Sequence, residues 1–166
     1  MSIDIKTNKF NYAILLGGTS GTGKSTIANK LAERLNLDDF VSTDTLREQL
    51  RNEVPSDKCP ILHASSYYAG EYFIPNNNNS NIFTIKYNNV MEEKTIKGYE
   101  LQNEIIFPMI ESKLRNSKQK ERPIIIEGVH LSIKNILQIK KQYNYVIPAL
   151  IYLKDQVKII LNLILI

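Results

Sequence analysis

Residues 18–25 place three glycines, a lysine and a serine in the pattern G-x-x-x-x-G-K-[ST], and no other feature restricts the fold of this chain as strongly. The glycines let the backbone bend so that successive N–H groups point inward, toward an anion. A short apolar run at 12–16 precedes the loop. Apolar residues at three- and four-residue spacing follow it from Lys24 onward, and Asn36 is expected to close that helix. The sequence therefore predicts a buried strand, a phosphate-binding loop and an amphipathic helix in succession.

This succession is the context in which such a loop binds a nucleoside triphosphate, whereas a glycine-rich turn that fits the pattern by chance would lack it. The positive end of the following helix would face the same phosphates. Lys24 is expected to reach the β- and γ-phosphates, and the Ser25 hydroxyl to bind Mg²⁺. We therefore expect a nucleoside triphosphate and Mg²⁺ as ligands. The expected nucleotide-binding residues are Gly18, Thr19, Ser20, Gly21, Thr22, Gly23, Lys24, Ser25 and Thr26.

The rest of the chain alternates between strand and helix patterns. Further strands are predicted at 39–43, 124–126 and 149–153, and further helices after 43, over 99–114 and over 132–142. Thr43 or Asp44 is expected to cap the second helix, and Pro108 predicts a kink in the third. Alternation of this kind is typical of βαβ units. We therefore expect an α/β fold, with a mostly parallel sheet and helices on both faces.

The length of 166 residues favours a single domain over residues 1–166. An asparagine-rich stretch at 75–90 is interpreted as a surface loop. Cys59 is the only cysteine, which excludes an intramolecular disulfide and favours an inert reduced thiol. The first eleven residues lack an apolar stretch of signal-peptide length, so the cytoplasm is the expected location. The apolar tail at 157–166 is too short to span a membrane.

The net charge is mild, at +4 from 21 basic and 17 acidic residues. Such a field suits an anionic ligand without pointing to nucleic acid. We therefore expect a small anionic phosphorylated substrate, no nucleic acid and no membrane. The tail at 157–166 is too apolar to be solvated alone, so it is expected to pack on the sheet or to mediate self-association.

Two charged residues are candidates for the acceptor side of the site. Asp44 stands at the end of the predicted strand 39–43, where parallel sheets bind their ligands. Its carboxylate either accepts the proton of an acceptor hydroxyl or holds Mg²⁺ through water, or it simply caps a helix. Arg47 lies on the same helix face and either meets a second anionic group on the acceptor or is exposed to solvent. With Lys24, these two are the expected catalytic residues.

Glu127 is the candidate metal ligand beside Ser25. It ends a strand of three isoleucines, where a charge is costly unless a cation or strong donors meet it. The alternative is a strand end that faces water. Gly128 is expected to permit close approach of substrate. His130 follows in the same loop and is interpreted as structural. His63 and the tyrosine pair at 67–68 either line the acceptor pocket or serve packing.

Five blocks of this sequence, standing in order, resemble the 2-phosphoglycerate kinase family: 17–28, 42–48, 62–69, 98–102 and 124–131. The resemblance implies a P-loop NTPase/kinase fold and transfer of the γ-phosphoryl group of ATP, with Mg²⁺, to 2-phosphoglycerate. The product would be 2,3-bisphosphoglycerate. It also implies that Lys24 and Ser25 serve the nucleotide, that Asp44 and Arg47 face the acceptor, and that Glu127 serves the metal.

The chain departs from this family's pattern near its C-terminal end. Such kinases continue into an arginine-bearing lid, but here no arginine follows Arg122. We therefore expect an altered or shortened end. Three functions stay open: a 2-phosphoglycerate kinase, a P-loop kinase of another acceptor (a nucleoside, a sugar or a polynucleotide end), or a nucleotide-binding protein without transfer.

Overall fold

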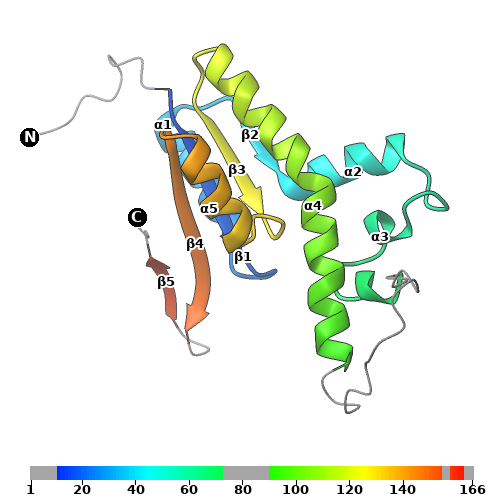
Figure 1. Cartoon of the computed structure of the whole chain (residues 1–166). Helices are drawn as coiled ribbons and strands as arrows, with labels where there is room; N and C mark the ends of the chain where they lie inside the picture. The colour runs from blue at the N-terminus through cyan, green and yellow to red at the C-terminus, as the bar shows by residue number, and fades with distance from the viewer. Residues whose placement is uncertain (1–10, 73–89, 155–157, 163–166) are drawn as a thin grey trace, which may run out of the picture.

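The computed structural model describes residues 11–72, 90–154 and 158–162. In this part of the chain, one sheet contains strands in the order β2-β3-β1-β4-β5 (Figure 1). Its strands are β1 (Ala13–Gly18), β2 (Phe40–Ser42), β3 (Ile124–Gly128), β4 (Val146–Lys154) and β5 (Lys158–Asn162). The first four pair in parallel, and β5 runs antiparallel to β4 at the edge. The expected strands at 12–16, 39–43, 124–126 and 149–153 are thus confirmed within a few residues.

The helices cover both faces of this sheet. They are α1 (Lys24–Leu35), α2 (Thr43–Glu53), α3 (Pro60–His63), α4 (Val90–Gln119) and α5 (Ile133–Gln142), with a 3₁₀ turn, η1 (Ala69–Tyr72), between α3 and α4. Figure 1 shows α1 behind the strands and α5 in front of them. The expected α/β architecture is confirmed.

Side chains that alternate along the strands form two separate cores. On one face, Leu16 and Ile125 pack with Ala28 of α1. On the other face, the buried cluster combines side chains from β1 and β3 with side chains from α2, α4 and α5, namely Leu15, Ile126, Leu46, Ile110 and Ile139. The apolar stripes read from the sequence therefore face the sheet.

The start of α2 differs from the expectation. Ser42 is the N-cap, because its hydroxyl oxygen accepts a hydrogen bond from the Thr45 N–H at 3.0 Å. Thr43 and Asp44 lie in the first helical turn instead. A side-chain N-cap typically has an extended backbone, and Ser42, the last residue of β2, has φ −93° and ψ 148°. Asp44 is therefore free of the capping role.

Other details agree with the sequence. Asn36 ends α1 in the left-handed conformation, with φ 51°. Pro108 lies inside α4, and Figure 1 shows that the two halves of this helix run in different directions. The expected loop at 75–90 lies, apart from Val90, outside the described residues.

The tail at 157–166 is described only in part. Its residues Lys158–Asn162 form β5 and pair with β4, so this segment packs on the sheet. Self-association through the tail stays a prediction. Among the described helices, none combines the length and the apolar character that a membrane crossing requires.

Candidate functional site

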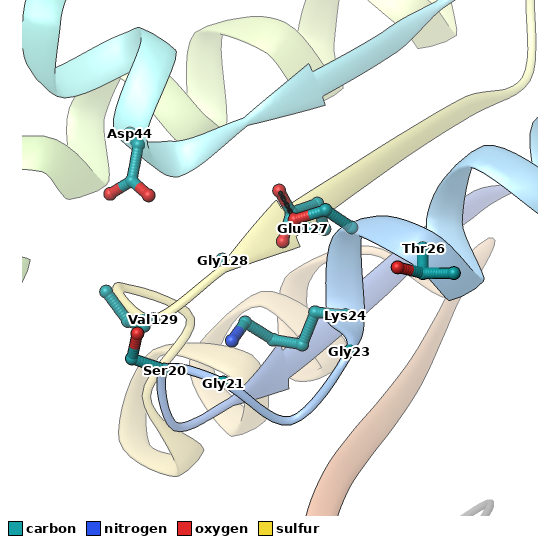
Figure 2. A pocket seen from close by; sticks show the side chains of 10 residues that line it. Ser20, Gly21, Gly23, Lys24, Thr26, Asp44, Glu127, Gly128 and Val129 are labelled. Carbon is teal, nitrogen blue, oxygen red and sulfur yellow. Dashed lines mark hydrogen bonds between the residues drawn. The ribbon is translucent and has the colours of Figure 1, made fainter.

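A cavity of about 220 Å³ opens at the carboxyl ends of β1 and β3. One wall is the loop after β1 with the first turn of α1. The other walls are the end of β3 and the first turn of α2 (Figure 2). Most of the expected nucleotide-binding residues line it, together with Asp44 and Glu127: Ser20, Gly21, Gly23, Lys24, Ser25 and Thr26. The fold therefore brings together two sets of site residues that stand about a hundred positions apart in the sequence.

The loop after β1 is shaped as an open cradle. Gly21 and Gly23 have φ of 79° and 80°, in the left-handed region that suits glycine. A Cβ atom built at either position would meet nothing within 4 Å, so the backbone conformation and not crowding requires glycine here. Gly23 is also the N-cap of α1 and offers no side-chain cap, which leaves the first N–H groups of the helix for a ligand.

Lys24 directs its ammonium group along the inner side of this loop (Figure 2). Only 6% of the residue is exposed, and its Nζ donates a hydrogen bond to the Thr19 carbonyl at 2.5 Å. Burial lowers the pKa of Lys24, while the charges of Glu127 and Asp44 act in the opposite direction. A desolvated cation therefore stands where an anionic ligand would enter the cradle.

Ser25 of α1 and Glu127 of β3 bring two oxygen-bearing side chains together in the cavity. The Ser25 hydroxyl donates to Oε1 of Glu127 at 3.1 Å, and Glu127 is only 5% exposed. Burial raises the pKa of this carboxyl, against the Ser25 hydrogen bond and the Lys24 charge, which lower it. Glu127 is therefore not a strand end that faces water, and its expected role as a metal ligand stays a prediction.

This pair fits Mg²⁺. The ion prefers oxygen ligands and commonly takes one or two from the protein, with phosphates and waters completing its shell. The described residues contain no group of three or more His, Cys, Asp or Glu side chains placed to form an all-protein metal cluster. A buried carboxylate beside a hydroxyl, at the wall of an anion cradle, is a donor set of the required kind.

Asp44 enters the cavity from α2. Figure 2 shows its carboxylate on the far side of the cavity from the phosphate loop, apart from Glu127. Its side chain is 73% exposed, so solvent and ligands reach it. This is the arrangement that an acceptor-binding carboxylate requires.

Arg47 does not line this cavity. Its guanidinium is buried and donates to the carbonyls of Leu62, at 2.9 Å, and of Ala64. Arg51 joins it by donating to the Leu62 and His63 carbonyls, so these two arginines tie the end of α3 to α2. The structure therefore gives Arg47 a structural task in place of the expected contact with an acceptor, and it is not exposed either.

The other acceptor-pocket candidates also lie away from the cavity lining. The ring of His63 makes a hydrogen bond with the Val54 carbonyl at 2.7 Å, which supports the structural interpretation. Tyr67 and Tyr68 are 70% and 62% exposed.

Gly128 lines the cavity, and the expected approach of substrate there stays a prediction; the structure adds a second reason for glycine at this position. Its φ is 147°, and a Cβ atom here would lie 1.8 Å from Oγ1 of Thr43. The glycine therefore lets the end of β3 approach the start of α2. This close approach carries Asp44 to the edge of the cavity.

His130, interpreted from the sequence as structural, lies next to Asp44. It is fully buried, and its Nδ1 lies 4.0 Å from Oδ1 of Asp44. Burial, followed by the charge of Arg47, lowers the pKa of His130 to about 4, and Asp44 opposes this shift. The only signal in the sequence is its position two residues beyond β3.

The sequence matches the model of a known protein family. A model described as an AAA domain matches residues 14–126. An uncharacterized protein of Dictyostelium discoideum is 38% identical over 158 residues, which are 95% of this chain and 18% of that protein.

Two proteins named 2-phosphoglycerate kinase are also similar. The one from Thermococcus kodakarensis is 30% identical over 88% of this chain and 46% of its own length. The one from Methanocaldococcus jannaschii is 34% identical over 71% of this chain and 34% of its own length. The chain thus spans less than half the length of each of these relatives. The resemblance to 2-phosphoglycerate kinases and the P-loop kinase fold are confirmed.

Proposed function

The chain belongs to the AAA-domain family, and we propose that it is a kinase that transfers the γ-phosphoryl group of ATP to 2-phosphoglycerate. The products would be ADP and 2,3-bisphosphoglycerate. One observation carries the proposal: a single cavity joins the phosphate cradle, the Ser25–Glu127 pair and the exposed carboxylate of Asp44. The relatives named 2-phosphoglycerate kinase support this choice of acceptor.

The cradle side would hold the donor. The loop N–H groups and the free N–H groups at the start of α1 would bind phosphate oxygens. The Lys24 ammonium would turn from the Thr19 carbonyl to the β- and γ-phosphates. Mg²⁺, when bound by Ser25 and Glu127, supplies positive charge that offsets the charge of the polyphosphate.

The far side would serve the acceptor. Asp44 would accept the proton of the free hydroxyl of 2-phosphoglycerate as the hydroxyl oxygen forms its bond to the γ-phosphorus. The bond between that phosphorus and the β–γ bridging oxygen breaks in the same transfer, and ADP leaves with the electron pair. The reaction therefore needs no residue of the chain to form a covalent intermediate.

The test is ADP formation with and without 2-phosphoglycerate, with the product identified by ³¹P NMR. We expect turnover that depends on the acceptor. Asp44→Asn should lower kcat by about 10²- to 10⁴-fold, the usual contribution of a general base, and should leave ATP binding nearly unchanged. If the phosphoryl group were transferred only to a nucleoside, a sugar or a polynucleotide end, that molecule would take the place of 2-phosphoglycerate as the proposed acceptor. Tight binding of Mg-ATP without turnover on any of them would make the protein a nucleotide-binding protein without transfer.

A further inference from the structure

The imidazole of His130 is buried without a hydrogen-bond partner. Its exposed fraction is 0%, and no described protein atom makes a hydrogen bond with Nδ1 or Nε2. An imidazole always carries at least one N–H, and a buried donor left unpaired costs free energy. Native proteins contain few such groups, and each calls for an explanation. One such explanation is that the imidazole gains its hydrogen-bond partner in another state of the site.

The surroundings fix the direction of this ring. It stacks on Tyr99 of α4, with centroids 6.3 Å apart and planes at 26°. The Tyr99 hydroxyl donates to the Val129 carbonyl at 2.5 Å, which holds the loop after β3 against α4. In this orientation Nδ1 faces Oδ1 of Asp44 at 4.0 Å. In the described part of the chain, His130 is the basic side chain that the structure places within 4.0 Å of the Asp44 carboxylate.

Burial is the main cause that keeps the ring neutral, and two nearby arginines act in the same direction. Arg47 and Arg51, both on α2, disfavour the imidazolium, as burial does, and Asp44 favours it. The pKa falls to about 4, so one nitrogen carries the proton and the other is bare at neutral pH. Only a proton on Nδ1 can be donated toward Asp44.

We propose that His130 is a positioning residue, whose Nδ1–H donates to one carboxylate oxygen of Asp44 and thereby turns the other oxygen toward the acceptor hydroxyl. The inference rests on the proposed function, because it assigns the proton transfer to Asp44. The separation of 4.0 Å exceeds hydrogen-bond length by about 1 Å. Asp44 is exposed at the first turn of α2, and a rotation of its side chain has room to close this gap. His130 keeps its own proton throughout.

The first test reads the position of that proton and requires no turnover. The chain has two histidines, so ¹⁵N-histidine labelling gives two imidazoles, and a His63→Asn variant assigns them. We expect His130 in the Nδ1–H tautomer at neutral pH. Asp44→Ala should move the population toward Nε2–H. A wild-type protein in the Nε2–H form, or a population that Asp44→Ala does not change, would overturn the proposal.

The second test compares two replacements of His130. Asn places an amide donor near the position of Nδ1, whereas Leu removes the donor at a similar volume. We expect His130→Leu to lower kcat by roughly 10- to 100-fold, the effect of one hydrogen bond to a charged group, with the KM for ATP unchanged. His130→Asn should recover most of that loss. Equal losses in both variants, following their loss of thermal stability, would show a purely structural role.

The two tests separate this inference from the proposed function. If the wild-type protein transfers nothing to 2-phosphoglycerate, the proposed function is wrong, and the tautomer experiment still decides whether His130 donates to Asp44. If transfer occurs and the tautomer is Nε2–H, the function stands and the inference is wrong.

Discussion

The ammonium of Lys24 is held by a backbone carbonyl in place of water. The residue is 6% exposed and donates to the Thr19 carbonyl, and burial is the main cause of its lowered pKa. Much of the desolvation of this cation is therefore already present in the folded protein. A polyphosphate that displaces the carbonyl gains a charge-assisted hydrogen bond with little further loss of hydration.

Lys24→Ala should therefore weaken ATP binding by at least about 10- to 100-fold, the range for a hydrogen bond to a charged group. The fold should persist, because the substitution removes a buried charge whose pKa burial lowers. Titration calorimetry with Mg-ATP measures the affinity. Lys30→Ala, an exposed lysine of the same helix, removes the same charge outside the cavity and should bind ATP like the wild type. Equal affinity in the Lys24 variant would contradict the assignment of the loop.

The buried carboxyl of Glu127 makes the stability of the protein depend on pH. Its folded pKa is raised by burial above the ordinary value of 4.5, so the folded protein holds this proton more tightly than the unfolded chain. The carboxyl therefore costs no stability below the unfolded pKa. It costs progressively more as the pH rises through the folded pKa.

Glu127→Gln should consequently unfold with a higher free energy than the wild type at neutral pH, and the difference should shrink as the pH falls toward 4.5. The same variant should lose the Mg²⁺ dependence of ATP binding, because it loses an anionic oxygen ligand. Denaturant titrations across this pH range, paired with calorimetry, provide both measurements. A lower stability of the variant at neutral pH would mean that the Ser25 hydrogen bond and the Lys24 charge outweigh burial.

At the scale of elements, η1 meets α4 through a contact between two glycines. A Cβ atom on Gly98 would lie 2.1 Å from the backbone nitrogen of Gly70, and one on Gly70 would lie 1.9 Å from the carbonyl oxygen of Lys94. Backbone therefore packs on backbone, which only glycine allows at this separation. The contact attaches the segment after α3 to the helix that also carries Tyr99.

In the Gly98→Ala variant, two effects on stability oppose each other and differ in size. Helix propensity would favour alanine by about 1 kcal/mol, but forcing a methyl group into this contact costs typically about 1–3 kcal/mol. We expect net destabilisation, with faster hydrogen exchange of the amides in η1. Asn116→Ala, at an exposed position of the same helix, gains propensity without a clash and should be slightly more stable than the wild type. A gain of stability in the Gly98 variant as well would contradict the close packing.

The elements that build the sheet are predictable from local pattern. The three isoleucines of β3 and the apolar stripe of α1 are properties of consecutive residues, so the sequence alone indicates them. The N-cap of α2 shows the limit. Ser42, Thr43 and Asp44 are all good capping residues, and the choice depends on where the extended strand ends.

The parts of the site that are predicted wrongly from the sequence depend on contacts between residues far apart in the chain. The carbonyls that bind the Arg47 guanidinium lie 15 and 17 residues away, at the end of α3, and no local sequence pattern predicts this contact. His130 is buried because Tyr99 of α4 covers it, another contact between separate elements. The cradle residues, by contrast, are consecutive, and the structure places most of them in the cavity wall as expected.

At the scale of the whole molecule, the site is a junction of elements from both halves of the chain. The stretch matched by the AAA-domain family, residues 14–126, runs from β1 into β3 and so includes the cradle and Asp44. Glu127 and His130 follow directly after it. Any global change that loosens the contact between β3 and α2 must therefore act on the donor and acceptor sides together.

The buried imidazole should make the stability of the whole protein sensitive to mild acid. His130 titrates near 6.5 when unfolded and at about 4 when folded, so the unfolded chain binds its proton first as the pH falls. The stability associated with the neutral ring is thus complete above pH 6.5 and is lost as the pH approaches 4. A shift of this size corresponds to roughly 3 kcal/mol, a large share of the stability of an ordinary domain.

His130→Leu isolates this contribution, because the carboxylates that also titrate in this range remain in both proteins. We expect the wild type to lose stability relative to the variant between pH 6.5 and 4, measured by denaturant unfolding at closely spaced pH values. The charges of Arg47 and Arg51 resist protonation of the folded ring, and Asp44 alone favours it. If the difference in unfolding free energy between the two proteins stayed constant across this range, the ring would gain its proton as readily in the folded protein as in the unfolded chain. Asp44 would then face an imidazolium in mild acid.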